Sequence, residues 1–282
     1  MFKKICIVGV GLIGGSLALA LKKARVSKTI VGVGHRNSSL EKAIKLGAID
    51  QGFLEFAKGI KGSDLVVLAT PVGIILKYLE KDFSSLKKGT VITDTGSTKK
   101  EIVKKADSFL SPSLYFVGAH PIAGSEMGGV EAATCDLFQK KTVVLTKTGK
   151  TKEKALLMIK KLWKSVGAEP KIVSPAEHDR IIAAYSHLPH LTAAVLVKTV
   201  KESLRGQDRA LAGSGFKDTT RIAASSAQLW SDIFSTNREE VLSALLNFKK
   251  SLSLLEKLLK KKDWKELKNQ LQKVRNFRRK LQ

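Results

Sequence analysis

The feature that most constrains the fold is a glycine-rich turn near the start of the chain. Gly9, Gly11 and Gly14 form a G-x-G-x-x-G pattern, which follows the apolar run Lys4–Val8 and opens the helical pattern Gly14–Lys23. In this context the first glycine permits a tight turn, the second lets the backbone approach a pyrophosphate, and the third lets helix and strand pack closely. The helix N-terminus attracts the anion. The alternative is a glycine turn without a ligand. The pattern favours a dinucleotide site, whose cofactor-binding residues are Gly9, Gly11, Leu12, Ile13 and Gly14.

The segment that would meet the adenosine ribose contains no acidic residue. In NAD-binding units a carboxylate about twenty residues after the glycines accepts a hydrogen bond from the ribose 2′-hydroxyl. At that place the chain has Gly34-His35-Arg36-Asn37-Ser38-Ser39. A small residue followed by imidazole, guanidinium and hydroxyl groups suits a 2′-phosphate better, although a polar loop tip is the alternative. The sequence therefore favours NADP over NAD, with His35, Arg36 and Ser38 near the phosphate.

Short apolar runs alternate with helical patterns through the first half of the chain. The predicted strands are Lys4–Val8, Thr29–Val33, Leu65–Ala69, Thr90–Asp94 and Tyr115–Ala119, and the predicted helices are Gly14–Lys23, Ser39–Leu46, Ile74–Leu79 and Lys99–Ser108. This alternation predicts a parallel sheet with helices on both faces. Two later strands, Lys141–Thr146 and Pro170–Val173, flank a helix over Lys152–Val166 and would extend the same sheet.

Beyond Pro175 the sequence shows only helical patterns. Leucines at three- and four-residue steps, such as Leu252, Leu255 and Leu259, indicate helix packing within the chain or against a partner subunit. The predicted fold class is α/β. A Rossmann-type parallel sheet domain over residues 1–174 is followed by an all-helical substrate and dimerisation domain over residues 175–282.

The chain is strongly basic, with 50 Lys and Arg against 25 Asp and Glu, a formal net charge of +25. Such a charge raises the possibility of nucleic acid or an acidic membrane surface as partner. However, the basic residues are spread along the chain, zinc-finger spacing is absent, and aromatic residues make up only 6%. We interpret the charge as the Lys-rich surface of an enzyme with anionic ligands, without a specific nucleic-acid or membrane partner.

The cysteines and apolar segments indicate the cellular compartment. Only Cys6 and Cys135 occur, far apart, so a disulfide framework is not expected and the compartment is predicted to be reducing and cytoplasmic. The N-terminal apolar stretch is interrupted by the glycines of the turn, which argues against a signal peptide. No segment has the length and apolar character of a membrane span.

Further polar stretches follow the predicted strands. They are Ala69-Thr70-Pro71, Asp94–Lys99 and Gly118–Glu126, and Ser186–His190 comes later in the chain. The first three stand at the carboxyl ends of parallel strands, where ligands bind in open α/β sheets. We therefore expect Thr70 and Pro71 at the cofactor, and Ser97 and His120 facing the nicotinamide. The segment Gly213–Arg221 adds cationic groups suited to a carboxylate.

The combination of D-x-G-S-x-K, G-x-H-P-[IM]-A-G, S-H-L-P and G-F-[KR]-D-x-[ST]-R, in this order, resembles the prephenate/arogenate dehydrogenase family over nearly the whole chain. The resemblance implies oxidative decarboxylation of prephenate to 4-hydroxyphenylpyruvate in tyrosine biosynthesis, with hydride transfer to NADP or NAD, by a homodimer. Arogenate is the alternative substrate. His120 would accept the hydroxyl proton, and Ser97 would form a hydrogen bond with the substrate hydroxyl and orient His120. Arg221 would hold a carboxylate through two hydrogen bonds.

The resemblance also implies roles for residues around these three. His190 and Lys217 would contact substrate, and Trp230 would form part of the pocket wall. Glu126 and Asp218 would form an ionic gate around the arginine, to which the partner subunit of a dimer could contribute one of the two residues. His187 is either a structural residue or a ligand, and we interpret His178 as structural. The five histidines lack metal-ligand spacing, so no metal is implied.

Two other functions remain open from the sequence. A β-hydroxyacid-type dehydrogenase shares the two-domain order, but it typically uses a lysine of the helical domain as acid and base, and the stretches around His120 and Ser186–His190 fit it poorly. A nucleotide-sensing or polyanion-binding protein on a former enzyme fold would account for the charge. The presence of Ser97, His120 and Arg221 together argues against that alternative.

Overall fold

The computed structural model describes residues 2–124, 128–204 and 209–281. Its contacts divide the chain into two compact units, with the division between Asn237 and Arg238. The first unit contains a sheet with flanking helices and a further helical segment. The second unit contains the last two helices. Glu126, which the sequence assigns to the ionic gate, lies outside the described residues.

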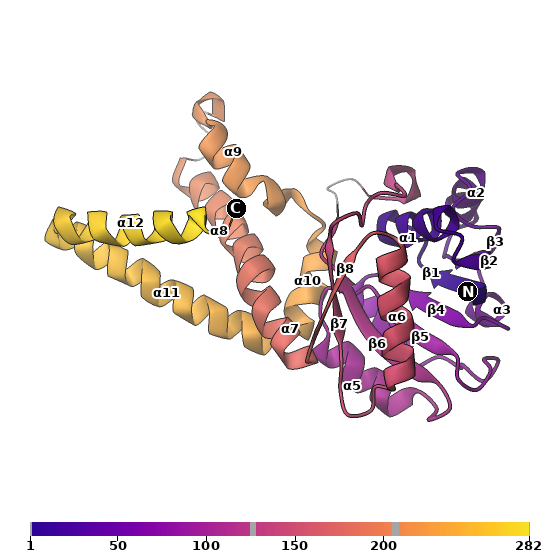
Figure 1. Cartoon of the computed structure of the whole chain (residues 1–282). Coiled ribbons are helices and arrows are strands. Elements are labelled where there is room, and N and C mark those ends of the chain that lie inside the picture. Colours follow the sequence, from indigo (N-terminus) through magenta and orange to yellow (C-terminus); the bar gives the residue numbers. More distant parts are fainter. Residues whose placement is uncertain (1, 125–127, 205–208, 282) are drawn as a thin grey trace. The chain divides into compact units, whose positions relative to one another are not determined.

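In the described part of the first unit, eight strands form one sheet (Figure 1). They are β1 Phe2–Val8, β2 Ser27–Val33, β3 Gln51–Phe53, β4 Leu65–Leu68, β5 Val91–Asp94, β6 Tyr115–Pro121, β7 Thr142–Thr146 and β8 Glu169–Val173. The spatial order is β3-β2-β1-β4-β5-β6-β7-β8. The order reverses at β1, because β2 and β3 lie on one side of it and β4 to β6 on the other. Ligands of open α/β sheets bind at such a reversal.

Helices pack on both faces of this sheet (Figure 1). They are α1 Leu12–Lys23, α2 Asn37–Lys45, α3 Phe56–Ile60, α4 Val72–Tyr78, α5 Lys100–Phe109 and α6 Glu153–Ser165. Successive β1 side chains point to opposite faces. Ile5 and Ile7 therefore join a core with α1, α2 and α6, whereas Cys6 and Val8 join a core with α3, α4 and α5. Because β1 is buried on both faces of the sheet, its sequence is a nearly continuous run of apolar residues.

The predicted strands and the predicted helices of the sheet region are confirmed to within two residues at each end. The prediction of an all-parallel sheet is wrong at one place, because β7 runs antiparallel to β6, with His120 opposite Val144. A parallel pair needs a crossover connection, usually a helix. The described residues between β6 and β7 contain only the short 3-10 turn Val130–Ala132. The three-residue β3 and the five-residue α3 were not predicted, because runs this short carry little periodicity.

A helical segment completes the first unit. It comprises α7 Pro175–Ile182, a π-helical turn Ala183–His187, α8 Leu188–Leu204, α9 Ser214–Thr220, a 3-10 turn Arg221–Ala224 and α10 Ala227–Thr236. The start of α7 is fixed locally. Ser174 caps it by accepting a hydrogen bond from the Glu177 amide (3.1 Å), and Pro175 supplies the backbone angle of the first turn. The domain boundary predicted after residue 174 falls between β8 and α7 and stays a prediction.

The second unit consists of α11 Arg238–Lys261 and α12 Trp264–Arg279. Asp263 caps α12 by accepting a hydrogen bond from the Glu266 amide (3.0 Å). Both helices expose large apolar side chains, which are Leu242, Leu246, Phe248, Leu252, Leu254, Leu259, Trp264, Leu271, Val274 and Phe277. An apolar surface of this extent is typical of an interface with another protein.

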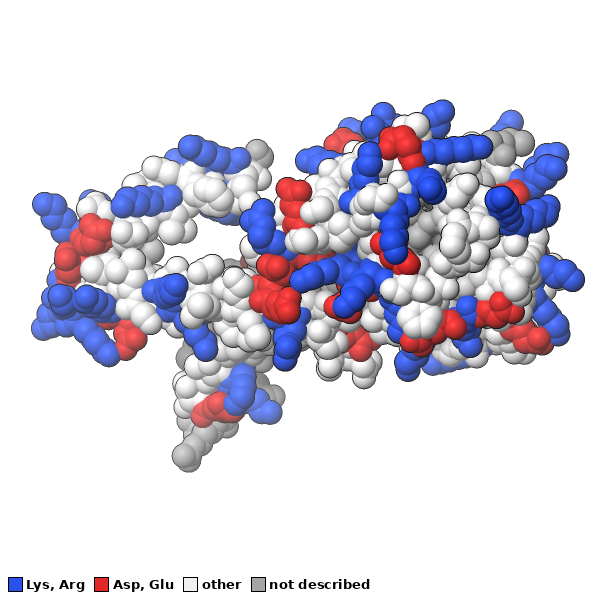
Figure 2. Space-filling view, turned by 90° about the horizontal axis from the view of Figure 1, so that it is seen from below, with Lys and Arg blue, Asp and Glu red and all other residues white. Residues whose placement is uncertain are grey.

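The basic side chains do not gather into one stripe on the face seen in Figure 2, where Lys and Arg are scattered with Asp and Glu between them. Some basic side chains of the protein form salt bridges with acidic residues from distant parts of the sequence, as in Lys22 with Asp50 (2.5 Å) and Lys23 with Asp136 (2.8 Å). None of the helices in the described ranges is both long and apolar enough to cross a membrane.

Candidate active site

The glycine turn has the geometry that a dinucleotide site requires. Gly9 has a φ of +95°, and a Cβ there would lie 2.6 Å from the Ala69 carbonyl oxygen. A Cβ on Gly14 would lie 2.1 Å from the Gly9 carbonyl oxygen, so this glycine allows α1 to pack on β1. A Cβ on Gly11 would meet nothing within 4 Å. The first and third glycines are therefore required by the fold, while the second leaves open space where a pyrophosphate can approach.

A cleft of about 660 Å³ opens at this turn. Its lining includes Gly11, Leu12, Ile13, Thr70, Pro71, Thr95, Gly96, Ser97, Gly128, Gly129 and Arg221. The N-cap residue Gly11 offers no side chain to the first amides of α1, which leaves their N–H groups for an anion. The Thr70 hydroxyl is buried without a hydrogen-bond partner among the described residues. These features fit a bound dinucleotide. His35, Arg36 and Ser38 do not line the cleft and are exposed at the start of α2.

A second cavity of about 430 Å³ adjoins the cleft. Its lining includes Ser97, His120, Ser186, His187, Arg221, Trp230 and Ile233. The cavity and the cleft share Ser97, Ala123, Gly124, Arg221, Ser225 and Leu229. A molecule in the cavity would therefore be next to the end of a nucleotide in the cleft. The structure thus brings together four residues predicted from the sequence, which are Ser97, His120, Arg221 and Trp230.

Three other predicted substrate residues do not line this cavity. Lys217 and Asp218 are exposed on α9. His190 lies on α8, stacked on the Trp230 ring with 3.6 Å between ring centroids and an interplanar angle of 10°. It therefore supports one face of the cavity wall.

Buried Asp94 positions both Ser97 and His120. It stands at the end of β5, where its carboxylate accepts hydrogen bonds from the Gly96 amide (2.8 Å) and the Ala119 amide (3.0 Å). It also forms a fully buried ion pair with Lys99. These contacts tie the loop that carries Ser97 to the strand that carries His120. Removing one partner of a buried pair costs about 3–5 kcal/mol, because the remaining charge is left uncompensated.

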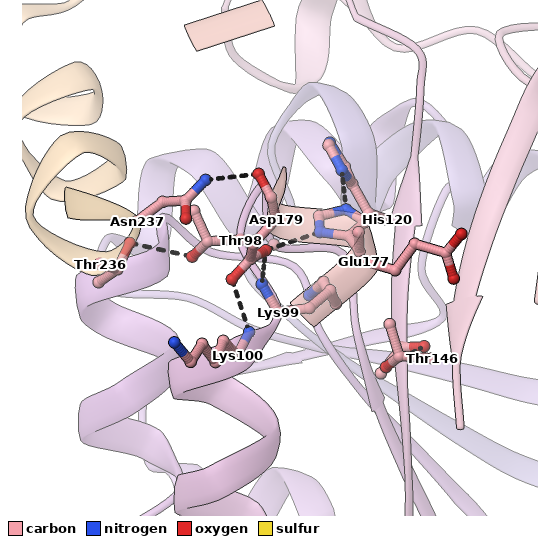
Figure 3. A network of polar contacts seen from close by, with 12 residues as sticks. Thr98, Lys99, Lys100, His120, Thr146, Glu177, Asp179, Thr236 and Asn237 are labelled. Carbon is pink, nitrogen blue, oxygen red and sulfur yellow. Dashed lines mark hydrogen bonds and ion pairs between the residues drawn. The ribbon is translucent and has the colours of Figure 1, made fainter. Parts of the chain in front are cut away.

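His120 is the end of a chain of side-chain contacts (Figure 3). Its Nδ1 lies 2.8 Å from Nε2 of His178, and Nδ1 of His178 lies 2.7 Å from Oδ1 of Asp179. His178 and Asp179 are fully buried on α7. His178 thus contacts the predicted catalytic histidine from a buried position, and Asp179, which the sequence motifs do not include, contacts His178 in turn. The sequence offered one signal, a carboxylate beside a histidine at the start of a capped helix.

His187 occupies the π-helical turn between α7 and α8, an irregularity that is frequent at functional sites. The Asn237 side-chain amide lies 3.1 Å from Nδ1 of His187 and donates to the Asp179 carbonyl oxygen (2.9 Å). Within the described ranges, Nε2 of His187 has no hydrogen-bond partner. The turn thus places His187 at the cavity and links it to the backbone of α7.

The buried histidines favour the neutral form. Burial holds the pKa of His120 well below its ordinary value of 6.5, and the nearby His178, Lys99 and His187 add to this effect. Burial also lowers the pKa of His178, although the hydrogen bond to Asp179 opposes it. The pKa of His187 is lowered by burial to about 4. At neutral pH His120 is therefore a neutral imidazole that can accept a proton.

These pKa values predict a loss of stability in acid. A histidine whose pKa is lower in the folded than in the unfolded chain stabilises the fold above the unfolded pKa, and this contribution is lost as the pH falls through the folded pKa. For His187 the window runs from 6.5 down to about 4, and the expected loss in unfolding free energy at pH 5 is about 2 kcal/mol. Urea unfolding at pH 7.5 and pH 5 measures this loss, which should shrink in His187→Gln. Equal stability at both pH values would contradict the prediction.

Metal-binding clusters are absent from the described residues, in which no group of three or more His, Cys, Asp or Glu side chains could hold an ion. Both cysteines are free thiols, and burial raises the pKa of Cys6 to about 12. Among the described residues, the lining of the cavity offers imidazole, hydroxyl and guanidinium groups.

Comparison with known proteins places these features in a family. Residues 17–172 match the family model "Prephenate dehydrogenase, nucleotide-binding domain", and residues 174–273 match "Prephenate dehydrogenase, dimerization domain". A prephenate dehydrogenase of Bacillus subtilis (strain 168) is 41% identical over 241 residues, which are 84% of this chain. The chain spans 65% of the length of that relative.

Two solved structures share the fold over nearly the full length of both chains. Prephenate dehydrogenase from Aquifex aeolicus, in complex with hydroxyphenyl propionate and NAD+, has a TM-score of 0.94 and 36% identity, covering 100% of this chain and 99% of that one. Arogenate dehydrogenase from Synechocystis has a TM-score of 0.84 and 31% identity, covering 99% of this chain and 100% of that one. On the two family models, which together match most of its length, the chain belongs to the prephenate dehydrogenase family.

Proposed function

We propose that the protein is a nicotinamide-dependent prephenate dehydrogenase, which converts prephenate to 4-hydroxyphenylpyruvate in tyrosine biosynthesis. The observation that carries the proposal is the shared lining of one cavity by Ser97, His120 and Arg221, next to the cleft of the glycine turn. This reaction needs a group that accepts a proton, a hydroxyl that orients this acceptor and the substrate, and a cation that anchors a carboxylate.

The reaction transfers a hydride from the carbinol carbon of a cyclohexadienyl acid and releases CO2 as the ring becomes aromatic. The hydroxyl proton that a base takes up as the hydride leaves returns to the same oxygen when the phenol product forms. A nicotinamide in the cleft supplies the hydride acceptor. His120 accepts the hydroxyl proton at Nε2, because its Nδ1 contacts His178. Ser97 lies on the shared wall of cleft and cavity, where its hydroxyl can bond the substrate oxygen and hold it toward His120. A neutral base at pH 7 and a fixed orientation together lower the barrier.

Arg221 anchors a substrate carboxylate in this proposal. It begins the 3-10 turn after α9 and lines both the cavity and the cleft. A guanidinium can hold a carboxylate through two parallel hydrogen bonds. Trp230 closes one wall, supported by His190. Glu126 and Asp218 remain predicted as an ionic gate around this arginine, and Lys217 remains predicted as a substrate contact.

For the cofactor we propose a preference for NADP over NAD. The support is the exposed segment His35 to Ser38 at the start of α2, where Arg36 is the N-cap residue and no carboxylate is available for a ribose 2′-hydroxyl. A 2′-phosphate there would meet the first amides of α2 together with imidazole and guanidinium side chains. The Aquifex aeolicus relative is described with NAD+, so NAD is the alternative.

A two-by-two assay tests the activity, the substrate and the cofactor together. Reduced nicotinamide is followed with prephenate or arogenate as substrate and NAD or NADP as acceptor. We expect the highest kcat/KM with prephenate and NADP. A higher kcat/KM with NAD would refute the cofactor preference, and a preference for arogenate would favour the activity named for the Synechocystis relative. No turnover in any combination by folded protein would refute the proposed function.

We also propose that the protein is a cytoplasmic homodimer. The support is the match of residues 174–273 to a dimerization domain and the exposed apolar side chains of α11 and α12. A second copy of the chain would cover these side chains without requiring another protein.

A further inference from the structure

We propose that His178 and Asp179 are positioning residues of the reaction, which act behind His120 and fix its tautomer so that Nε2 is the proton acceptor toward the cavity. The proposal rests on the proposed dehydrogenase function and extends it to two residues of α7. Neither residue lines the cavity, so their effect must pass through His120.

Asp179 determines the orientation of the protons in this chain of contacts (Figure 3). Its Oδ1 accepts a hydrogen bond from the Lys99 amide (2.7 Å), and its Oδ2 accepts one from the Lys100 amide (2.8 Å). These amides begin α5, so the carboxylate also neutralises the positive end of that helix. A carboxylate held in this way is an acceptor only. The contact of 2.7 Å with His178 therefore requires the proton on Nδ1 of that histidine.

The state of His178 then decides the state of His120. Neutral His178 with its proton on Nδ1 has a lone pair on Nε2, which lies 2.8 Å from Nδ1 of His120. The opposite tautomer of His120 would place two lone pairs against each other at this distance. His120 must therefore carry its proton on Nδ1, which leaves the lone pair of Nε2 for the substrate hydroxyl.

The same arrangement stabilises His120 after it has accepted a proton. Once Nε2 is protonated, the ring is a cation that donates from both nitrogens. His178 accepts from Nδ1 without moving a proton, and the negative charge of Asp179 lies directly behind it. In a buried site such fixed partners replace the water that would otherwise solvate the cation.

Several other charged or titratable groups surround the two histidines. Lys99 and Asp94 form the buried pair at the end of β5, and His187, in the π-helical turn, interacts electrostatically with both His120 and His178. Lys99 and His187 disfavour a positive charge on His120, whereas Asp179 and Asp94 favour one on His178. Asp179 is the carboxylate in direct contact with the imidazole chain, which makes it the residue to change.

Asp179→Asn tests the proposal, because an amide can donate to Nδ1 of His178 and so reverse the chain of protons. The chain has only five histidines, so long-range ¹H–¹⁵N NMR can report the tautomer of each one directly. In the unchanged protein we expect His120 and His178 to be protonated on Nδ1. In Asp179→Asn we expect both protons on Nε2, and kcat lower by about 100-fold or more, with the substrate KM within about threefold.

A control variant removes a partly buried carboxylate that also accepts two backbone hydrogen bonds but lies elsewhere in the fold. Oδ2 of Asp64 also accepts two backbone hydrogen bonds, from the amides of Lys3 (2.6 Å) and Lys4 (3.1 Å), but has no hydrogen bond to a histidine. Asp64→Asn should keep the tautomers and kcat, even if it lowers the melting temperature.

A second pair of variants changes His178. The amide oxygen of His178→Gln can accept from His120, so this variant should retain more kcat than His178→Leu, which removes the acceptor.

The outcomes separate this inference from the proposed function. A spectrum with His120 protonated on Nε2 in the unchanged protein would overturn it. An Asp179→Asn variant that loses thermal stability but keeps the histidine tautomers and kcat would also overturn the inference. Equal kcat in His178→Gln and His178→Leu would do the same. The folded protein could also turn over neither prephenate nor arogenate and still carry the His120 proton on Nδ1. That result would uphold the tautomer assignment and refute the dehydrogenase function.

Discussion

Replacing His120 with Asn should lower kcat about 1000-fold while leaving nucleotide binding nearly unchanged. The Asn side-chain amide can still donate to Nε2 of His178, but it has no group at the position of Nε2 of His120. The variant therefore removes the proton acceptor and keeps the contact behind it. General bases contribute about 10²–10⁴ to rate, which sets the expected size of the loss.

The measurement is kcat for the preferred substrate and cofactor, together with the Kd of the nucleotide and the melting temperature. His120 lines the cavity but not the cleft, so nucleotide affinity is the internal control for a folded site. A variant that binds nucleotide normally and retains nearly normal kcat would remove His120 from the mechanism. Loss of both properties would point instead to a collapse around the buried Asp94 and Lys99 pair.

Replacing Arg221 with Ala should raise the substrate KM about 100-fold with a smaller change in kcat. Hydrogen bonds to charged groups are worth about 1.5–3 kcal/mol, and each 1.4 kcal/mol corresponds to a factor of about ten in binding. Arg221 also lines the nucleotide cleft, so the KM of the cofactor is measured beside that of the substrate. The cofactor KM should change much less.

Two variants show whether the effect depends on the guanidinium. Arg221→Lys keeps the positive charge but cannot form two parallel hydrogen bonds, and its substrate KM should lie between those of the unchanged protein and the alanine variant. Lys164→Ala removes an exposed cation from α6, which lines neither cavity nor cleft, and should leave both KM values unchanged. An unchanged substrate KM in Arg221→Ala would refute the carboxylate anchor.

The sheet and its ligand edge could be predicted because their signals are local. An apolar run such as Leu65–Leu68 is buried on both faces, and the turn at Gly9 needs a positive φ that glycine adopts without strain. Parallel strands end at one edge of a sheet, so polar residues that follow β4, β5 and β6 must lie near one another. Ser97 and His120, which the sequence predicts to lie on the same side of the cofactor, accordingly line one cavity.

The features that the sequence did not reveal depend on contacts between distant segments. The direction of β7 depends on the connection from β6, whose described residues contain a short 3-10 turn and no crossover helix, and this difference has no signal in the sequence pattern. His190 belongs to the same motif as His187, yet its side chain stacks on Trp230 rather than lining the cavity. Proximity in the sequence did not distinguish these two histidines, because residues three apart share one face of a regular α-helix, and the π-helical turn that ends at His187 interrupts this register.

The sequence by itself determined the α/β fold and the dinucleotide turn, and it predicted Ser97, His120 and Arg221 as the residues that act on the substrate. Each of these follows from local backbone requirements or from the chemistry of a short motif. Only the tertiary structure decided which groups stand behind His120. His178 lies 58 positions further along the chain and reaches it because α7 packs beside the edge of the sheet, where Asp179 caps α5. The orientation of a proton depends on such a partner, and no local pattern can specify a partner from a distant segment.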